Sequence, residues 1–138
     1  MVYSGEKAAG TVFLIAVTQF VLGLIIAEAL YPSYSVSDNY ISDLGVGSSS
    51  VVFNSSVFLL GLLLLIGVYF LRRTTDFKTV NTLLVLMAVG AMGTGVFTKA
   101  FTLAHGGLSS MAFLFAGLSA IASFKATKKP MSLVGMIL

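Results

Sequence analysis

Four long apolar stretches, separated by short polar segments, dominate the chain. They run over about residues 8–30, 51–71, 80–97 and 108–124. A hydrocarbon core about 30 Å thick needs roughly 20 helical residues, and each stretch comes close to that length. The stretches lack the strict alternation that is typical of a transmembrane β-strand. The pattern therefore predicts four membrane-spanning helices.

The composition agrees with a membrane interior rather than with water. Apolar residues make up 57% of the 138 positions and charged residues only 9%, whereas an ordinary soluble domain carries about 25% charged residues. Fourteen glycines lie among the Leu, Val, Ile and Phe runs, as expected where helices approach closely inside lipid. We therefore expect an all-α integral membrane protein, a four-helix bundle that forms one membrane domain over residues 1–138.

Few residues are available for metal or cofactor chemistry. The chain has no Cys and one His, which excludes disulfides, iron–sulfur clusters and a haem with two imidazole ligands. Its eight Lys and Arg residues lie beside the apolar stretches rather than in one patch, so no nucleic-acid partner is expected. We expect no cofactor, and membrane lipid as the immediate partner.

Basic residues are distributed unequally between the two ends of the predicted helices. If the N-terminus is cytoplasmic, seven basic residues lie on the cytoplasmic side: Lys7, Arg72, Arg73, Lys78, Lys125, Lys128 and Lys129. Only Lys99 then lies on the outer side. Because Lys and Arg are retained on the cytoplasmic side, the count predicts a cell-membrane protein with both termini in the cytoplasm and the 31–50 loop outside.

Two segments leave alternatives open. Ala27-Glu28-Ala29 has the small-x-small form of a signal-peptide cleavage site, although the apolar stretch before it is longer than a typical signal core. Residues 131–138 form a short apolar tail that cannot span a membrane. This tail is either the start of a fifth helix or a segment packed at the cytoplasmic interface.

The loop after the first stretch contains signals for a short helix. Ser37 is a good N-cap, Asp38 favours the positive end of a helix dipole, and Gly45 can end a helix in the left-handed conformation. The sequence therefore predicts a short external helix from Asp38 to Leu44 at the membrane interface. Helical spacing gives it an apolar face that rests on the bundle, Tyr40, Ile41 and Leu44, and a polar face, Asn39, Ser42 and Asp43.

Further polar residues are predicted on the same side of the membrane. Asn54 lies about one turn into the second stretch and needs a hydrogen-bond partner, because an unpaired amide is costly in lipid. Near the start of the fourth stretch, His105 and Ser109 are four residues apart and share a helix face. The candidate polar site comprises Asn39, Ser42, Asp43, Asn54, Lys99, His105 and Ser109.

Two interpretations of this candidate polar site remain open. In one, Asp43 orients or charges His105, and Lys99 binds an anionic head group. In the other, which we favour, the residues form hydrogen bonds that pin the loop to the bundle. A Ser-His-Asp hydrolase using Ser109 or Ser42 lacks the nucleophile-elbow motif, and a metal site at His105 with nearby carboxylates lacks motif spacing. We therefore assign no catalytic residue and no metal ligand.

Small and amide side chains are expected to mediate contacts inside the bundle. Gln19 is placed to make an interhelical hydrogen bond. The third stretch carries a set of small residues that form small-xxx-small pairs: Gly90, Ala91, Gly93, Thr94 and Gly95. Such pairs allow close helix contact, either within the bundle or against another subunit.

The segments 34–45 and Phe53-Asn54-Ser55 resemble an uncharacterised multi-pass membrane family known as domain of unknown function nine-nine-eight. Members show an aromatic-Ser start, then Asn, Ser-Asp-Leu-Gly and Phe-Asn-Ser, and a later His-x-x-x-Ser that matches His105 and Ser109. The resemblance covers about residues 10–125. Members usually have six spans, and no established activity comes with the resemblance. It implies that the recognisable residues of such proteins concentrate at these positions.

Sparse charge, a small chain and the lack of specific catalytic spacing favour a non-catalytic role. We expect an accessory or structural subunit of a larger membrane assembly, with other membrane subunits or copies of itself as partners. An alternative is a membrane-embedded hydrolase or transferase that acts on a lipid or lipid-linked substrate at the outer face. A third is a small-solute carrier, although the mid-membrane polar residues are limited to Gln19 and a few Thr and Ser.

Overall fold

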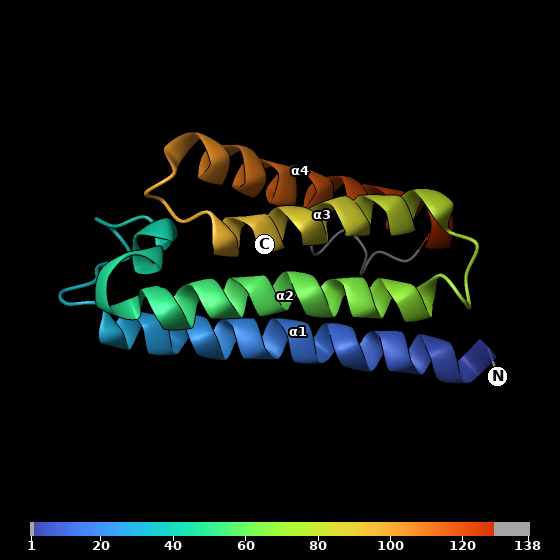
Figure 1. Ribbon diagram of the computed structural model, residues 1–138. Helices are drawn as coiled ribbons and strands as arrows, with labels where there is room; N and C mark the ends of the chain where they lie inside the picture. Colours follow the sequence, from blue (N-terminus) through green and yellow to red (C-terminus); the bar gives the residue numbers. More distant parts are fainter. Residues whose placement is uncertain (1, 129–138) are drawn as a thin grey trace.

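The protein is all-α, as the sequence predicts. The computed structural model describes residues 2–128. Within that range it contains four long helices, α1 (Val2–Leu30), α2 (Ser50–Leu71), α3 (Lys78–Val96) and α4 (Thr102–Thr127), and two short 3₁₀ helices, η1 (Ile41–Gly45) and η2 (Gly47–Ser49) (Figure 1). The predicted apolar tail over 131–138 lies outside the described residues.

The four predicted helices are confirmed. Two of them match the predicted ends closely, and the other two are longer than predicted. α2 and α3 begin and end within two residues of the predicted positions, whereas α1 begins at Val2 rather than at 8, and α4 extends from Thr102 to Thr127 rather than from 108 to 124. Helical hydrogen bonds do not require an apolar side chain, so a helix continues into polar residues until its backbone turns away. All four helices are long and apolar enough to cross a membrane, and the protein is a multi-pass membrane protein.

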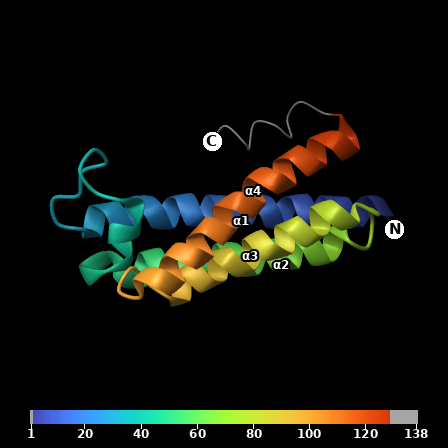
Figure 2. The same cartoon turned by 90° about the horizontal axis from the view of Figure 1, so that it is seen from above.

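Each long helix packs mainly against the next one along the chain. Consecutive helices are antiparallel, and α4 crosses α3 at an angle (Figures 1 and 2). Phe13 of α1, Leu64 of α2, Met87 of α3 and Ala116 of α4 are among the residues that line an apolar hollow of about 230 Å³ between the helices. In α4 only Ser119 is buried. This helix packs mainly against α3, and its other sides are exposed.

Glycines allow the helix backbones to approach closely. A Cβ added at Gly61 of α2 would lie 2.5 Å from the carbonyl oxygen of Ala88 in α3, and one at Gly95 of α3 would lie 2.7 Å from the carbonyl oxygen of Asn54. On the other side of α3, a Cβ at Gly90 would lie 2.7 Å from the backbone nitrogen of Ala112 in α4. The small residues of α3 therefore form contacts on two faces of that helix.

Two of the other small residues of α3 also have defined neighbours. A Cβ at Gly93 would lie 2.7 Å from the Leu108 side chain of α4. The hydroxyl of Thr94 donates a hydrogen bond to the carbonyl oxygen of Gly90, at 2.8 Å. Ala91 is buried, with 5% of its surface exposed. These contacts lie within the chain itself.

The predicted interhelical hydrogen bond of Gln19 is confirmed. Its Nε2 donates to the carbonyl oxygen of Ser56 in α2, at 3.0 Å, and also lies 3.1 Å from the carbonyl oxygen of Ala16 one turn earlier. An amide inside lipid is costly when unpaired, and this arrangement pairs it. The amide therefore stabilises the contact between α1 and α2.

The alternating helices separate the polar segments into two ends. We call the end formed by residues 31–49 and 97–101 the loop end. The opposite end carries the described basic residues that were predicted to share one side of the membrane: Lys7, Arg72, Arg73, Lys78, Lys125 and Lys128. We call this the basic end.

Candidate functional site

The first loop contains a short helix, as predicted, but this helix is of the 3₁₀ type and begins at Ile41 rather than at Asp38. The segment contains a turn over residues 36–38, followed by the 3₁₀ helix η1. The backbone N–H of Ser35 donates to Oδ1 of Asn39 at 3.0 Å, and the Ser35 hydroxyl donates to Oδ2 of Asp38 at 2.8 Å. Such local side-chain bonds compete with helix formation. Ser37 is therefore part of this turn and not the N-cap of a helix.

The N-cap of η1 is Tyr40, whose backbone is extended. Its backbone N–H donates a hydrogen bond to Oδ2 of Asp43, at 3.0 Å. A carboxylate three residues after an N-cap satisfies a donor that the helix itself leaves free. Asp43 is thereby fixed in orientation by its own helix.

Leu44 attaches the loop to the long helices. Its side chain has 0% of its surface exposed and packs in a cluster with Ala27 of α1 and Phe53 and Val57 of α2. The predicted apolar face also included Tyr40 and Ile41, and this part of the prediction is wrong, since they are 76% and 55% exposed. The 3₁₀ helix begins only at Ile41 and is five residues long, so it presents one side chain to the core.

Directly beneath η1, Asn54 of α2 holds the end of the loop. Its Nδ2 donates a hydrogen bond to the carbonyl oxygen of Gly45, at 2.9 Å. A Cβ at Gly45 would lie 2.9 Å from Oδ1 of Asn54, so the missing side chain permits the approach. The left-handed residue expected at Gly45 is instead Gly47, with φ of +73°.

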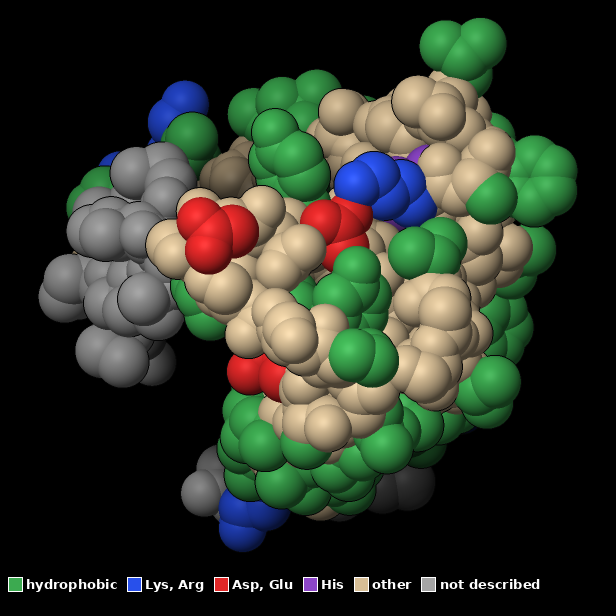
Figure 3. All heavy atoms as spheres, turned by 90° about the vertical axis from the view of Figure 1, so that its left-hand side faces the viewer, with side chains coloured by type: hydrophobic (Ala, Val, Ile, Leu, Met, Phe, Trp, Pro, Cys, Tyr) green, Lys and Arg blue, Asp and Glu red, His purple; other side chains and the backbone are tan. Residues whose placement is uncertain are grey.

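Lys99 and Asp43 form an ion pair that joins the two segments of the loop end. Nζ of Lys99 donates a hydrogen bond to Oδ1 of Asp43, across a sequence separation of 56 residues. Nζ also lies 5.3 Å from the ring centroid of Tyr40. The Asp43 side chain is 14% exposed and the Lys99 side chain 44%. Figure 3 views this end and shows acidic and basic side chains meeting on its surface.

The ion pair changes the acidity of both groups. The hydrogen bond from Lys99 is the main cause that lowers the pKa of Asp43 below its ordinary value of 3.8, and the backbone N–H of Tyr40 acts in the same direction. The hydrogen bond to Asp43 raises the pKa of Lys99 above its ordinary value of 10.5. Both residues are therefore charged throughout the neutral range. We call this pair the Asp43–Lys99 latch.

The latch is expected to be insensitive to pH between about 5 and 9. Because the pKa of Asp43 is lower in the folded loop than its ordinary value of 3.8, the ionised carboxylate stabilises the folded loop at pH values above 3.8. This contribution is lost as the pH falls from 3.8 through the lowered pKa. Because the pKa of Lys99 is higher in the folded loop than its ordinary value of 10.5, the charged amine stabilises the folded loop at pH values below 10.5. This contribution is lost as the pH rises from 10.5 through the raised pKa.

This pH prediction can be checked by electron paramagnetic resonance. The chain has no native Cys, so spin labels can be placed at Ile41→Cys and Leu103→Cys, both of which are exposed. We expect an unchanged distance distribution from about pH 5 to 9 and a broader one below the folded pKa of Asp43. Broadening within the neutral range would contradict the assignment.

His105 and Ser109 have partners other than Asp43. Nδ1 of His105 lies 2.8 Å from the carbonyl oxygen of Phe97, and because a carbonyl only accepts, Nδ1 carries the proton. The Ser109 hydroxyl donates to the carbonyl oxygens of His105, at 2.8 Å, and of Gly106, at 3.2 Å. The His105 ring therefore fastens the start of α4 to the end of α3.

The candidate polar site thus divides into separate contacts within the chain. The structure brings Asp43 and Lys99 together, and Asn39 adds a hydrogen bond that further lowers the pKa of Asp43. Asn54 bonds the backbone beneath, and Ser42 is half-buried. Among the described residues, no three His, Asp or Glu side chains are grouped so that they could hold a metal ion.

Several serines that sequence reasoning did not single out hold this end together. Ser48 donates from its hydroxyl to the carbonyl oxygen of Leu30, at 2.7 Å, and so binds the last turn of α1. The fully buried Ser49 donates to the carbonyl oxygen of Leu44, at 2.8 Å. A serine run directly after Gly47, before an apolar stretch, was the available signal, because hydroxyls satisfy the carbonyl groups that helix ends leave free.

These observations define a multi-pass membrane protein with a polar, internally bonded loop end. The sequence matches the family described as protein of unknown function (DUF998) over residues 14–138. The chain therefore belongs to this family, and the resemblance seen in the sequence is confirmed. No curated protein and no solved structure matches the chain.

Proposed function

We propose that the chain is an accessory or structural subunit of a larger membrane assembly, without chemistry of its own. The observation that carries the proposal is the use of polar groups at the loop end. Asp43 pairs with Lys99, Asn54 with the carbonyl of Gly45, and His105 with the carbonyl of Phe97. Because these polar side chains bind other segments of the same chain, they support a role in fixing the shape of the loop end rather than a role in catalysis.

The exposed side of α4 supports the same proposal. Gly106, Ser110, Phe113 and Gly117 follow one another at helical spacing and share one face. Phe113 is 79% exposed, and a Cβ added at Gly106 or Gly117 would meet nothing within 4 Å. Small residues on an exposed face let another transmembrane helix approach closely. We propose this α4 face as the side on which a partner subunit packs.

We also propose an orientation, with the basic end in the cytoplasm and the loop end outside. Six described basic residues lie at the basic end, whereas Lys99 is the basic residue of the described loop end. Retention of Lys and Arg on the cytoplasmic side supports this choice. Both chain ends would then be cytoplasmic in the cell membrane.

The two other functions considered from the sequence receive less support. A hydrolase or transferase at the loop end would require a hydroxyl, the imidazole and a carboxylate to act on one another, and here Asp43 and His105 have different partners. A carrier would require polar groups free to bind solute at mid-membrane, and Gln19 is engaged with Ser56.

The proposal is tested by native electrophoresis of membranes solubilised in mild detergent, with mass spectrometry of what migrates with the chain. We expect the chain in a complex with other polypeptides. Ser110→Leu, which fills the α4 face, should release it, because overfilled contacts are disfavoured by about 1–3 kcal/mol. Thr11→Leu, a similar change at an exposed position of α1, is the control and should leave the complex intact.

Two results would contradict the proposal. One is a chain that migrates alone in native membranes. The other is a lipid-modifying activity that Asp43→Asn or His105→Ala abolishes while the migration of the chain is unchanged. The second result would support the hydrolase or transferase instead.

A further inference from the structure

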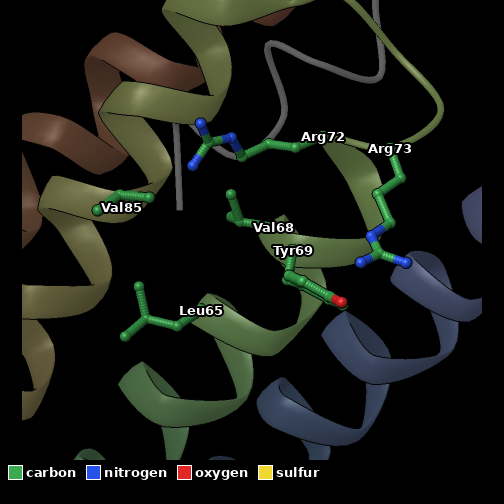
Figure 4. Close-up of a pocket in the computed structure, with 6 residues that line it drawn as sticks. All are labelled: Leu65, Val68, Tyr69, Arg72, Arg73 and Val85. Atoms are coloured by element: carbon green, nitrogen blue, oxygen red, sulfur yellow. The ribbon is translucent and has the colours of Figure 1, made fainter.

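A hollow lies between α2 and α3 at the basic end, on the opposite side of the membrane from the loop. Its volume is about 430 Å³, and it is lined by Leu65, Val68, Tyr69, Arg72 and Arg73 of α2 and Val85 of α3. Figure 4 shows the apolar side chains deeper along the helices and the two arginines at the end of α2. The hollow is therefore apolar along its length and cationic at one end.

The two arginines are available to an external anion. Neither pairs with a carboxylate among residues 2–128, where the ion pairs are Lys78–Asp76 and Lys99–Asp43. Both arginines are exposed. In Figure 4, Arg72 extends toward α3 above Val85, while Arg73 folds back beside Tyr69.

Tyr69 helps to hold one of these cations in place. Cζ of Arg73 lies 4.3 Å from the centroid of the Tyr69 ring. Stacking on an aromatic face orients a guanidinium group while leaving its N–H donors available. A guanidinium held in this way is a good partner for a phosphate, because its donors match the phosphate oxygens.

The apolar part of the hollow lies along the membrane-spanning helices α2 and α3. Val68 is 1% exposed and forms its floor, while Leu65 and Val85 are half-buried on its sides. A free phosphate ion makes no favourable contact with these apolar side chains, whereas the acyl chain of a lipid packs against them. Because α2 is about as long as the hydrocarbon core is thick, its end at Leu71 is expected at the headgroup layer, where Arg72 and Arg73 follow.

We propose that this hollow binds one anionic phospholipid of the surrounding leaflet. Its phosphate lies between Arg72 and Arg73, and one acyl chain follows the α2–α3 groove over Val68. The binding does not depend on the subunit role proposed above. In the proposed orientation the lipid comes from the cytoplasmic leaflet, where anionic lipids are attracted to basic side chains near the membrane surface.

A buried amide lies on α3 outside the lining of the hollow. Asn81 lies one helical turn before Val85, on the same face of α3. It is 6% exposed, and its Oδ1 has no hydrogen-bond partner among the described residues.

Native mass spectrometry of the full chain, released from nanodiscs, tests the proposal. Nanodiscs of phosphatidylcholine with phosphatidylglycerol at equal fractions supply the two competing lipids. We expect the wild-type chain to retain one phosphatidylglycerol in preference to phosphatidylcholine. Arg72→Gln with Arg73→Gln should lower this preference at least about 10-fold, because both side chains lose their charge-assisted hydrogen bonds to the bound phosphate and one such bond contributes about that factor.

A charge-matched control separates a site from general attraction. Lys125→Gln with Lys128→Gln removes two positive charges from the same end of the molecule, outside the hollow, and should leave the preference nearly unchanged. Val85→Phe, which fills the groove and keeps all charges, should lower retention. Equal losses from the two charge-removing pairs, or unchanged retention in Val85→Phe, would overturn the proposal.

Soluble glycerol phosphate distinguishes the lipid from a free phosphate ligand. Because the groove contributes through the acyl chain, an excess of glycerol phosphate should not displace the retained lipid. Displacement by glycerol phosphate would assign the arginines to a soluble phosphate compound and would contradict a lipid site.

Discussion

Replacing Leu44 by Ala is expected to release the loop from the long helices. Leu44 is the one residue of η1 whose large side chain is fully buried, and it packs on Ala27, Phe53 and Val57. Truncating a buried Leu to Ala costs about 2–5 kcal/mol. We therefore expect amide hydrogen exchange in residues 41–49 to accelerate at least about 30-fold, while α1 to α4 keep their protection.

Ile41→Ala is the matched control for this change. It shortens an apolar side chain in the same 3₁₀ helix, but Ile41 is 55% exposed. Exchange should then change little, since surface substitutions usually stay within about 0.5 kcal/mol. Equal acceleration in the two variants would contradict the anchoring role of Leu44.

The second large effect is expected at Gly61. A Cβ there would lie 2.5 Å from the carbonyl oxygen of Ala88 and 2.8 Å from the backbone nitrogen of Met92. Both atoms belong to the backbone of α3, so no side-chain rotation relieves the clash. Gly61→Ala should separate α2 from α3 and destabilise the protein by about 1–3 kcal/mol, measured as a lower thermal unfolding midpoint in detergent.

Gly117→Ala is the control for the packing argument. Gly117 is also a glycine inside a long helix, but a Cβ there meets nothing within 4 Å. The substitution should leave the midpoint unchanged or raise it, because Ala is favoured over Gly in a helix by about 1 kcal/mol. A midpoint in Gly61→Ala as high as in Gly117→Ala would show that the close approach of α2 and α3 is not required.

The long helices could be predicted because the bilayer imposes both their length and their apolar character. α2 ends at Leu71, directly before Arg72, as the polar residues indicated. The start of α4 was placed too late because Thr102 and Ala104 continue the helix without forming part of the apolar stretch. Hydropathy marks the hydrocarbon region, whereas the backbone hydrogen bonds determine where a helix begins.

The loop end was less predictable because its structure depends on contacts between distant segments. The sequence identified Asp43 and Lys99 as members of one polar group, but their pairing spans 56 residues and has no spacing rule. Asn54 was expected to need a partner, and the partner is the backbone carbonyl of Gly45 rather than a side chain. A backbone acceptor leaves no mark in the sequence, so this contact required the fold.

The Asp43–Lys99 latch is the contact on which the structural interpretation of the loop end most depends, and a charge swap tests it. With spin labels at Ile41→Cys and Leu103→Cys, the distance distribution would be compared among wild type, Asp43→Lys, Lys99→Asp and the double variant. We expect each single reversal to broaden the distribution through like-charge repulsion and the double variant to restore most of the narrow one. A double variant as broad as the single variants would contradict the latch.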